Sequence, residues 1–328
     1  MGLGAVGLAG ARHLLSSGRV DELVVFARNP SGAQRRAAQL GSAGAVRVEE
    51  LSSLVPGGWF GRAAAALFAT PWAGEAPREA VRAGLPVVSV ADTPSDVRSL
   101  LELDTEAKQR GVSVIAGAAM APGLSCLLAA FAATHLDELT EVHVAVLGTG
   151  GPACARSLRA ALRGQAEEWR DGGWRKVEGS GRELVWFPVE GGADCYRVSR
   201  ADPLLLARAF PGLASVSARV GVSRSGRARL WLRVPRGPKP RAGALVVEVR
   251  GRRAGRAETV LLGANGDPAS VAGAVAAGAT ELAGERRLRP GAGGLASMVD
   301  EPGGLLAWLA RRGVKAQLFE GAGPTPTW

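Results

Sequence analysis

The sequence has few cysteines, and they lie far apart. None of the three belongs to a C-x-x-C pair, which excludes a disulfide framework and a cysteine zinc site, so we expect no bound metal. Free thiols indicate a reducing compartment, and we expect the protein in the cytoplasm. There is only one tyrosine, and each of the three histidines has a structural explanation. Candidates for acid–base catalysis are therefore scarce.

Lysine is also scarce, so the net charge of +10 comes from arginine. Four of the 40 basic residues are lysine, which together with abundant alanine and glycine indicates codon bias rather than nucleic-acid binding. The most basic stretch, 219–256, alternates in part, with Arg227 and Arg229 on one face of an expected strand and Leu230 on the other. No nucleic-acid-binding motif accompanies it. We predict a sheet face that meets solvent or a second subunit, and hence a homodimer.

No apolar run is long enough to cross a membrane without a break. Residues 111–134 carry no charge, but Pro122-Gly123 divides them into a β-branched strand and a separate helix. An apolar content of 47% and a charged content of 21% are typical of globular proteins. At 328 residues we expect two domains, 1–121 and 122–328, with the C-terminal helices packing back on the first.

Glycine is plentiful, and the start of the chain uses it in a recognisable spacing. The G-x-G-x-x-G motif is Gly2-Leu3-Gly4-Ala5-Val6-Gly7, and helix-like residues 8–17 follow directly. In this motif the first glycine permits a tight turn, the second lets backbone N–H groups approach a pyrophosphate, and the third lets the helix pack on a sheet. A strand-like segment, 22–27, follows at the distance that the dinucleotide-binding fold requires. We predict that all six residues bind a dinucleotide.

One element expected beside this motif is missing. The motif should follow a buried strand, yet only Met1 precedes it. Because a sheet without its central strand would leave the turn unanchored, we expect a start about five to eight residues upstream, one strand length. The predicted fold is a Rossmann-type doubly wound parallel sheet with a truncated first strand.

Ala27-Arg28-Asn29 follow the second strand, where such folds contact the ribose. An acidic residue here would favour NAD, whereas an arginine suits the 2′-phosphate of NADP. Ala27 offers no carboxylate and Arg28 offers a cation, with Arg35 and Arg36 in the next helix. We predict NADP in preference to NAD, bound by Arg28 and Asn29. The alternative is that Arg28 is an ordinary surface residue.

Strand-like and helix-like segments then alternate, as in a doubly wound sheet. The expected strands are 45–48, 63–70, 86–90 and 112–115. Ligands bind at the carboxyl ends of such strands, so Thr70 and Pro71 are predicted cofactor contacts and Trp72 a predicted substrate contact. Asp92 follows the next strand and is a candidate catalytic residue. Its alternative role is to cap the following helix.

The second half of the chain predicts an α+β domain on a mainly antiparallel sheet. Arg156 and Arg159 share one face of a short helix, and because guanidinium groups bind carboxylates bidentately we predict that they hold the substrate. Exposure to solvent is the alternative. Tyr196 lies in a strand-like run and is a candidate proton donor; the alternative is a half-buried structural tyrosine.

Residues 112–126 combine a strand, a small-residue loop, Pro122-Gly123 and an apolar helix. This junction resembles the one at which the saccharopine dehydrogenase family leaves its cofactor domain. Similar features follow the same order over nearly the whole chain: the glycine motif, Ala69-Thr70-Pro71, Ala91-Asp92, Asp171-Gly172-Gly173-Trp174, Phe187-Pro188 and Gly291-Ala292-Gly293-Gly294-Leu295. Ala119-Met120-Ala121 stands where the family more often has a glycine followed by an aromatic and a polar or acidic residue.

The resemblance implies an NADP-dependent oxidoreductase that transfers hydride to or from an imine or carbonyl of an amino-acid-like small molecule. Met120 and Pro122 would then contact the cofactor, and Met120 and Gly123 the substrate. Two alternatives stay open. One is a reductase of an apolar enoyl or polyketide-type substrate, with an apolar pocket around Met120. The other is a non-catalytic dinucleotide-binding scaffold or redox sensor.

Overall fold

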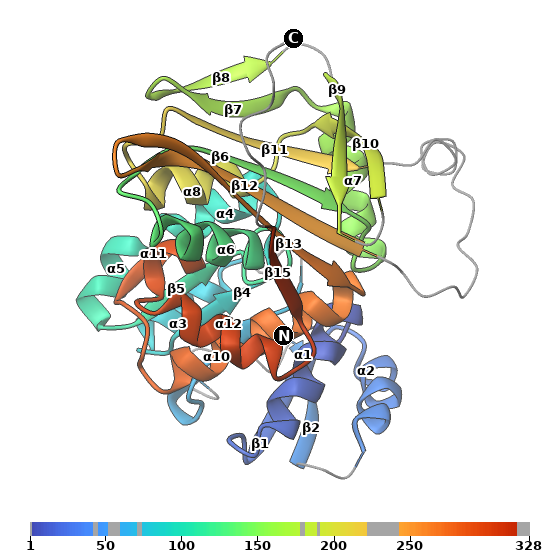
Figure 1. Cartoon of the computed structure of the whole chain (residues 1–328). Helices are drawn as coiled ribbons and strands as arrows, with labels where there is room; N and C mark the ends of the chain where they lie inside the picture. The colour runs from blue at the N-terminus through green and yellow to red at the C-terminus, as the bar shows by residue number, and fades with distance from the viewer. Residues whose placement is uncertain are drawn as a thin grey trace.

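The computed structural model describes residues 2–41, 45–51, 60–70, 74–177, 181–188, 191–221 and 243–319. Parallel strands with their helices form one part of the molecule, and a larger mixed sheet forms the other (Figure 1). This architecture confirms the predicted fold class, a Rossmann-type parallel unit beside an α+β unit whose sheet is mainly antiparallel.

The parallel unit alternates strands and helices, as predicted. One sheet pairs β1 (Glu22–Ala27) with β2 (Ala45–Glu50), and the other has the order β14 (Gly291–Gly293), β5 (Ser113–Ala116), β4 (Val87–Ser89), β3 (Ala66–Phe68). The helices are α1 (Ala5–Ser16), α2 (Pro30–Ala37), α3 (Ala76–Arg82), α4 (Pro94–Leu101) and α5 (Asp104–Arg110). Strands β4 and β5 are buried along their whole length, because continuous apolar runs suit parallel strands covered on both faces.

The parallel strands fall into two sheets, because among the described residues no strand pairs with both β1 and β3. Among the described residues, β1 pairs only with β2, and β3 pairs only with β4. Gly2 lies at the carboxyl end of this gap, where its backbone N–H donates to the carbonyl of Phe26 over 3.2 Å. The gap therefore falls where the first strand was predicted to be truncated.

The mixed sheet belongs to the second half of the chain. Its order is β15 (Lys315–Phe319), β13 (Arg256–Gly266), β12 (Gly243–Arg253), β6 (Glu138–Leu147), β11 (Ser215–Gly221), β10 (Gly191–Arg197), β9 (Arg182–Phe187), and β7 (Ala166–Arg170) joins β11 to β8 (Gly173–Val177). The helices of the second half of the chain are α6 (Leu124–Ala133), α7 (Pro152–Arg163), α8 (Asp202–Ala209), α10 (Pro268–Gly284), α11 (Leu295–Met298) and α12 (Pro302–Ala310), of which α10 and α11 contact strands of the parallel unit. Helices α6 and α8 pack on one face of this sheet.

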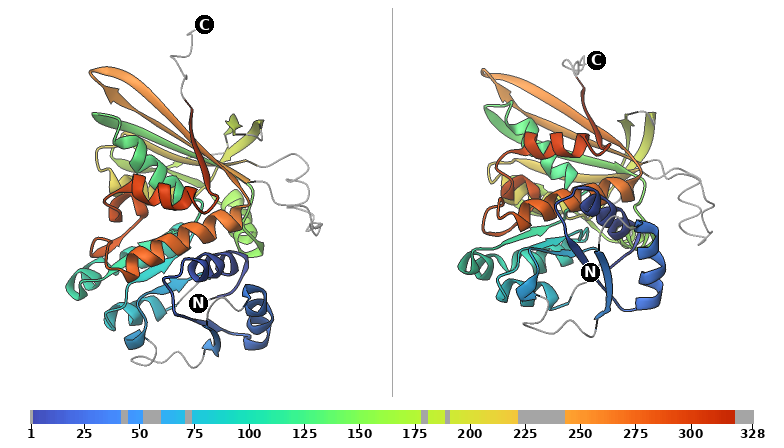
Figure 2. Two further views of the ribbon diagram at one scale, coloured as in Figure 1. Left: turned by 60° about the horizontal axis from the view of Figure 1, so that its bottom comes forward. Right: turned by 90° about the horizontal axis from the view of Figure 1, so that it is seen from below.

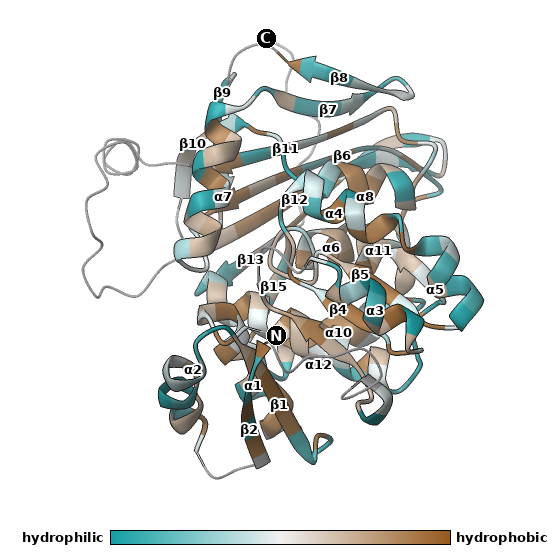
Figure 3. Ribbon diagram, turned by 180° about the vertical axis from the view of Figure 1, so that it is seen from behind, coloured by the Kyte–Doolittle hydropathy of each residue, from teal (hydrophilic) through white to brown (hydrophobic). Residues whose placement is uncertain are grey.

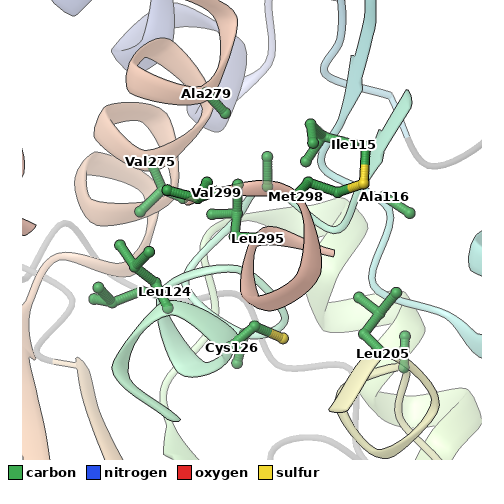
Figure 4. Close-up of a cluster of buried hydrophobic side chains, with 14 of the residues drawn as sticks. Ile115, Ala116, Leu124, Cys126, Leu205, Val275, Ala279, Leu295, Met298 and Val299 are labelled. Atoms are coloured by element: carbon green, nitrogen blue, oxygen red, sulfur yellow. The ribbon is translucent and has the colours of Figure 1, made fainter. Parts of the chain in front are cut away.

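One apolar core joins the two units. Ile115 of β5, Leu124 of α6, Leu205 of α8 and Leu295 of α11 are all at most 1% exposed, and they meet in a single cluster (Figure 4). Burying each of these side chains contributes roughly 2 kcal/mol. The units are therefore held together by hydrophobic contact as well as by the connecting chain.

The C-terminal segments return to the parallel unit. Strand β14 pairs with β5, and α10 lies along α1 (Figure 2). The two helices approach closely because Gly273 faces Ala9, and a Cβ on Gly273 would lie 2.5 Å from the Ala9 Cβ. The predicted domain boundary between residues 121 and 122 stays a prediction. The structure shows in addition that β14 and α10, which follow that boundary in the sequence, pack on the parallel unit.

For the basic stretch 219–256 we predicted a sheet face that meets solvent or a second subunit. The structure describes only part of this stretch. The alternating residues Arg227, Arg229 and Leu230 lie outside the described residues. Two flanking arginines are neutralised by acids, since Arg219 pairs with Glu183 and Arg250 pairs with Glu248. The homodimer stays a prediction. Among the described residues, no helix combines the length and the apolar character that a membrane span requires.

Candidate functional site

The three motif glycines have three different surroundings, and two of them leave no room for a side chain. Gly2 has a φ of +84°, and a Cβ there would lie 2.9 Å from the Ala69 carbonyl oxygen. A Cβ on Gly7 would lie 2.2 Å from the Gly2 carbonyl oxygen. Gly4, by contrast, has no atom within 4 Å of its Cβ position. The turn is therefore closed around Gly2 and Gly7 and open in front of Gly4.

The open space at Gly4 lies at the amino end of α1. Gly4 is the N-cap of this helix and has no side chain to accept hydrogen bonds from the first-turn N–H groups. Such groups, with the helix dipole, favour an anion. Arg36 donates to the Leu3 carbonyl over 2.9 Å and fixes the turn from outside. The backbone donors and the absence of a Cβ together fit a pyrophosphate.

Of the two residues predicted to contact the ribose, Asn29 caps a helix and Arg28 is exposed to solvent. The Asn29 side chain accepts a hydrogen bond from the Gly32 backbone over 2.9 Å and caps α2. Arg28 is exposed at the end of β1, and within the described part of the chain no hydrogen bond or ion pair holds its guanidinium. Arg28 thus stays available to an anionic ligand.

A cavity of about 70 Å³ lies between the motif helix and the second unit. Both halves of the chain line it: Val6, Val90, Asp92, Ala119, Met120, Ala121, Val146, Gly148, Thr149, Gly150, Cys154, Leu158, Arg200, Val220, Pro268 and Ala272. Its position outside the carboxyl end of β4 is where open α/β sheets bind ligands. Most of its wall is apolar, and Asp92 and Arg200 are its two charged groups.

Asp92 is free to serve this cavity because another residue caps α4. The Thr93 hydroxyl accepts the hydrogen bond from the Asp96 backbone, so the capping alternative for Asp92 is not realised. Burial raises the pKa of the Asp92 carboxyl, against the opposing effects of the Arg200 guanidinium and a hydrogen bond from the Ser157 side chain. A carboxyl in a cleft with a raised pKa is suited to general acid or base chemistry.

Cys154 lies beside Asp92 but is not suited to nucleophilic chemistry. Burial, with a contribution from Asp92, raises the pKa of its thiol. The thiol therefore stays protonated, and a protonated thiol is a poor nucleophile. We assign Cys154 to the wall of the cavity.

Arg200 connects the cavity to the crossover between the two units. Its guanidinium donates to the Ala121 carbonyl and, over 3.2 Å, to Asp202. Asp202 is fully buried and accepts a second hydrogen bond from Ser125 over 2.6 Å. Sequence reasoning missed Arg200, because one arginine among so many carries no signal. Its role depends on contacts between segments far apart in the chain.

The crossover itself is a tight turn that brings Met120 to the cavity. Gly123 has a φ of +131°, and a Cβ there would lie 2.2 Å from the Ala119 carbonyl oxygen. The Ala119 N–H donates to the Pro122 carbonyl, and the Leu124 N–H to the Ala119 carbonyl, both over 2.9 Å. Gly123 is thus required by the backbone. Its predicted contact with substrate, and the cofactor contact of Pro122, stay predictions.

We expect Gly123→Ala to lower the free energy of unfolding by about 4 kcal/mol, because strained backbone and overpacking each cost about 1–3 kcal/mol. Gly111→Ala is the matched control, since Gly111 has a φ of +64° but no atom within 4 Å of its Cβ position. The control should lose only about 1 kcal/mol. Urea unfolding measures both. Equal losses would show that the close approach at Gly123 is unimportant.

Other predicted site residues do not line this cavity. Arg156 is exposed, and neither it nor Arg159 belongs to the lining, which α7 provides through Cys154 and Leu158. Tyr196 is 8% exposed and packs with Leu158 in a small cluster behind the wall. Their roles in binding or catalysis stay predictions.

The predicted strand 63–70, which corresponds to β3, ends at Thr70, and Pro71 and Trp72 come directly after it. Thr70 lies next to Gly2, with its Cβ 3.6 Å from the position of a Gly2 Cβ. This places Thr70 beside the glycine turn, as a cofactor contact requires. Pro71 and Trp72 lie outside the described residues.

No protein-family model matches the chain, and no curated protein matches it by sequence. Solved structures do match. Apo saccharopine dehydrogenase (L-Glu forming) from Saccharomyces cerevisiae has a TM-score of 0.69 at 14% identity, over 97% of this chain and 98% of that one. Amine dehydrogenase from Mycobacterium smegmatis has a TM-score of 0.51 at 13% identity, over 90% and 93%.

An engineered D-amino acid dehydrogenase gives a TM-score of 0.52 at 14% identity, over 92% of this chain and 93% of that one. At such identities the similarity concerns the fold. Together with the glycine turn and the crossover at Pro122, the comparisons confirm the resemblance inferred from the sequence: this chain has a saccharopine dehydrogenase-like fold.

Proposed function

We propose that this protein is an NAD(P)-dependent oxidoreductase that prefers NADP and acts on an imine or carbonyl of an amino-acid-like small molecule. The observation that carries this proposal is the opening of the glycine turn at Gly4, close to a cavity that holds Asp92. Val6 of the motif helix lines that cavity directly. One site can therefore hold the diphosphate and present the reactive end of a dinucleotide to a titratable group.

The cofactor supplies the hydride chemistry, and the chain supplies binding and positioning. Gly4 and the first turn of α1 would hold the pyrophosphate, and Thr70 lies beside them. Arg28 supports the preference for NADP, because its exposed guanidinium can pair with a 2′-phosphate. An acidic residue, which would accept the ribose hydroxyl of NAD, is absent from Ala27-Arg28-Asn29.

The polar groups of the cavity support a small polar substrate. Asp92 can exchange a proton with an amine or imine nitrogen or a carbonyl oxygen, and Arg200 adds positive charge to the same cavity. An apolar enoyl substrate would offer the Asp92 carboxyl no polar partner inside the cavity and would displace water from it, which is costly. The similar folds named above belong to a saccharopine dehydrogenase, an amine dehydrogenase and a D-amino acid dehydrogenase, which favours an amino-acid-like compound.

The direct test is oxidation of NADPH and of NADH by the purified chain, with a panel of 2-oxo acids and ammonia as acceptors. We expect turnover with at least one acceptor and a higher kcat/KM with NADPH. Binding of NADPH without oxidation by any acceptor, including enoyl compounds, would favour the scaffold or sensor alternative. Turnover of enoyl compounds alone would favour the apolar reductase.

The cofactor preference gives a separate prediction. Arg28→Asp should weaken NADPH binding by about 10- to 100-fold, because a hydrogen bond between charged groups contributes about 1.5–3 kcal/mol. NADH binding should be unchanged or tighter. Arg110→Asp, at an exposed arginine that ends α5, is the matched control. Isothermal titration measures both nucleotides, and equal losses in the two variants would contradict the role of Arg28.

A further inference from the structure

Arg200 has two carboxyl groups near it and is paired with one of them. Its Nε donates to the Asp202 carboxyl over 3.2 Å. Asp92 lines the same cavity as Arg200, and the positive charge of Arg200 acts on it. In the part of the chain that the structure describes, however, no ion pair joins Arg200 to Asp92. Asp202 therefore takes the direct contact with the guanidinium.

Asp202 is fixed in this position by contacts from two helices. It is the first residue of α8, which lies beside α6 (Figure 3). The Ser125 hydroxyl of α6 donates to its carboxyl over 2.6 Å, and the side chain is fully buried. The amino end of a helix favours a negative charge. Together with the cationic Arg200, these contacts compensate the Asp202 carboxylate for the loss of water.

The guanidinium of Arg200 is held at two points. Besides the bond from Nε to Asp202, Nη2 donates to the Ala121 carbonyl of the crossover. A guanidinium is rigid and planar, so two bonds from different nitrogens fix its orientation as well as its position. A turn of this group toward Asp92 would break the bond to Asp202.

The separation of Arg200 from Asp92 suits acid–base chemistry. An arginine in direct contact with a carboxyl group lowers its pKa by about 1–3 pH units, whereas a general acid or base is most effective when its pKa lies near the working pH. We propose that Asp202 is a positioning residue, which binds Arg200 and so keeps the guanidinium out of contact with the Asp92 carboxyl. The part of this inference that concerns catalysis rests on the proposed function.

The other groups that face Asp92 do not supply a second cation. Ser157 and Cys154 approach from α7, and Asp96 approaches from α4. The serine is neutral and the cysteine thiol stays protonated, while burial and, to a smaller extent, the negative charge of Asp96 raise the pKa of Asp92. Among the described groups that act on Asp92, Arg200 is thus the only cation. Its distance decides how strongly the carboxylate is stabilised.

The experiment follows the titration of the Asp92 carboxyl carbon by NMR in the full chain, with Asp92→Asn to assign the signal. In Asp202→Asn the guanidinium loses its partner and should turn to Asp92. The apparent pKa of Asp92 should then fall by about 1–3 pH units. The acid limb of the kcat profile should move to lower pH with it. A merely structural role of Asp202 would lower Tm and move neither the titration nor the limb.

A double-mutant cycle shows whether Asp202 acts through Arg200. Arg200→Gln should raise the pKa of Asp92, because the cation is gone. When Asp202→Asn is added to Arg200→Gln, the pKa of Asp92 should change little further, since no guanidinium is left to move. The double variant leaves no member of the pair buried as an unpaired charge, so it should fold. An equally large effect of Asp202→Asn in both backgrounds would overturn the proposal.

Two further variants complete the test. Asp300→Asn is the matched control, because Asp300 is an exposed acid paired with Arg289 over 2.6 Å, and it should not change the titration of Asp92. Ser125→Ala removes only the hydroxyl contact of Asp202, and it replaces Asp202→Asn if that variant does not fold. It should lower the pKa of Asp92 by a smaller amount. An unchanged titration in every folded variant of Asp202 or Ser125 would contradict the proposal.

The NMR titration does not depend on turnover, so this inference and the proposed function fail separately. The expected shift without oxidation of NADPH by any acceptor would support the positioning of Arg200 and contradict the proposed function. Turnover with an acid limb that Asp202→Asn leaves in place would support the oxidoreductase and contradict the role of Asp202.

Discussion

Gly4→Ala should weaken NADPH binding about 100-fold and leave Tm unchanged. The Cβ of the new residue would meet no protein atom within 4 Å, and Gly4 has a φ of −73°, which alanine adopts without strain. The methyl group would instead occupy the space in which a pyrophosphate approaches the backbone. A loss of about 3 kcal/mol, two hydrogen bonds to a charged group at the low end of their range, corresponds to this factor.

Gly7→Ala, unlike Gly4→Ala, should lower the stability of the protein as well as its affinity for NADPH. Its Cβ would lie 2.2 Å from the Gly2 carbonyl oxygen, so the turn itself must shift. We expect a loss of about 3 kcal/mol of stability, a fall in Tm of about 6–12 °C, and loss of NADPH binding as well. Differential scanning calorimetry and isothermal titration measure the two effects.

The matched control for both variants is Gly212→Ala. Gly212 also has open space at its Cβ position and is exposed, but it lies away from the turn. It should change neither Tm nor affinity. If Gly4→Ala bound NADPH as tightly as Gly212→Ala does, the open side of the turn would not be a phosphate site, and the oxidoreductase proposal would lose its main support.

Asp92→Asn should lower kcat by about 10²- to 10⁴-fold, the usual contribution of a general acid or base. An amide keeps the shape of the carboxyl but cannot exchange a proton at neutral pH. If Asp92 acts as the base, the activity of the unmodified protein should fall as pH drops through its raised pKa. In Asp92→Asn this limb of the pH profile should disappear. Steady-state kinetics across pH measure both effects.

The titration of Asp92 should affect the stability of the folded protein in the opposite direction to its effect on activity. Because the pKa of Asp92 is raised in the folded protein, its stabilising contribution is present below the ordinary carboxyl pKa of 3.8 and is lost as pH rises through the folded value. Its charged form therefore opposes folding at neutral pH. Asp92→Asn should keep or raise Tm there, which a purely structural role would not predict.

Asp171→Asn is the control for Asp92→Asn. Asp171 is exposed in a turn with a φ of +49°, a conformation that asparagine also adopts readily. It should change neither kcat nor Tm. Equal activity of the two variants would exclude Asp92 as the catalytic group, and a lower Tm for Asp92→Asn would assign it to the structure instead.

The sequence predicted well wherever the determining contacts are local. The spacing of Gly2, Gly4 and Gly7 defines a turn whose geometry depends on adjacent backbone, and the break at Pro122-Gly123 marks a crossover for the same reason. The β-branched residues at 112–115 indicated a strand, and β5 is buried there along its whole length.

The tertiary structure decided which side chains meet. Helical periodicity grouped Arg156 with Arg159, but it cannot say which face of α7 turns inward, and the lining residues are Cys154 and Leu158. The sequence left two roles open for Asp92, capping α4 or facing the cleft. The structure decides between them because the neighbouring Thr93 caps α4. Arg200 reaches the crossover only because separate segments fold together. Contacts between residues distant in sequence have no local signature, so they emerge only when the core is packed.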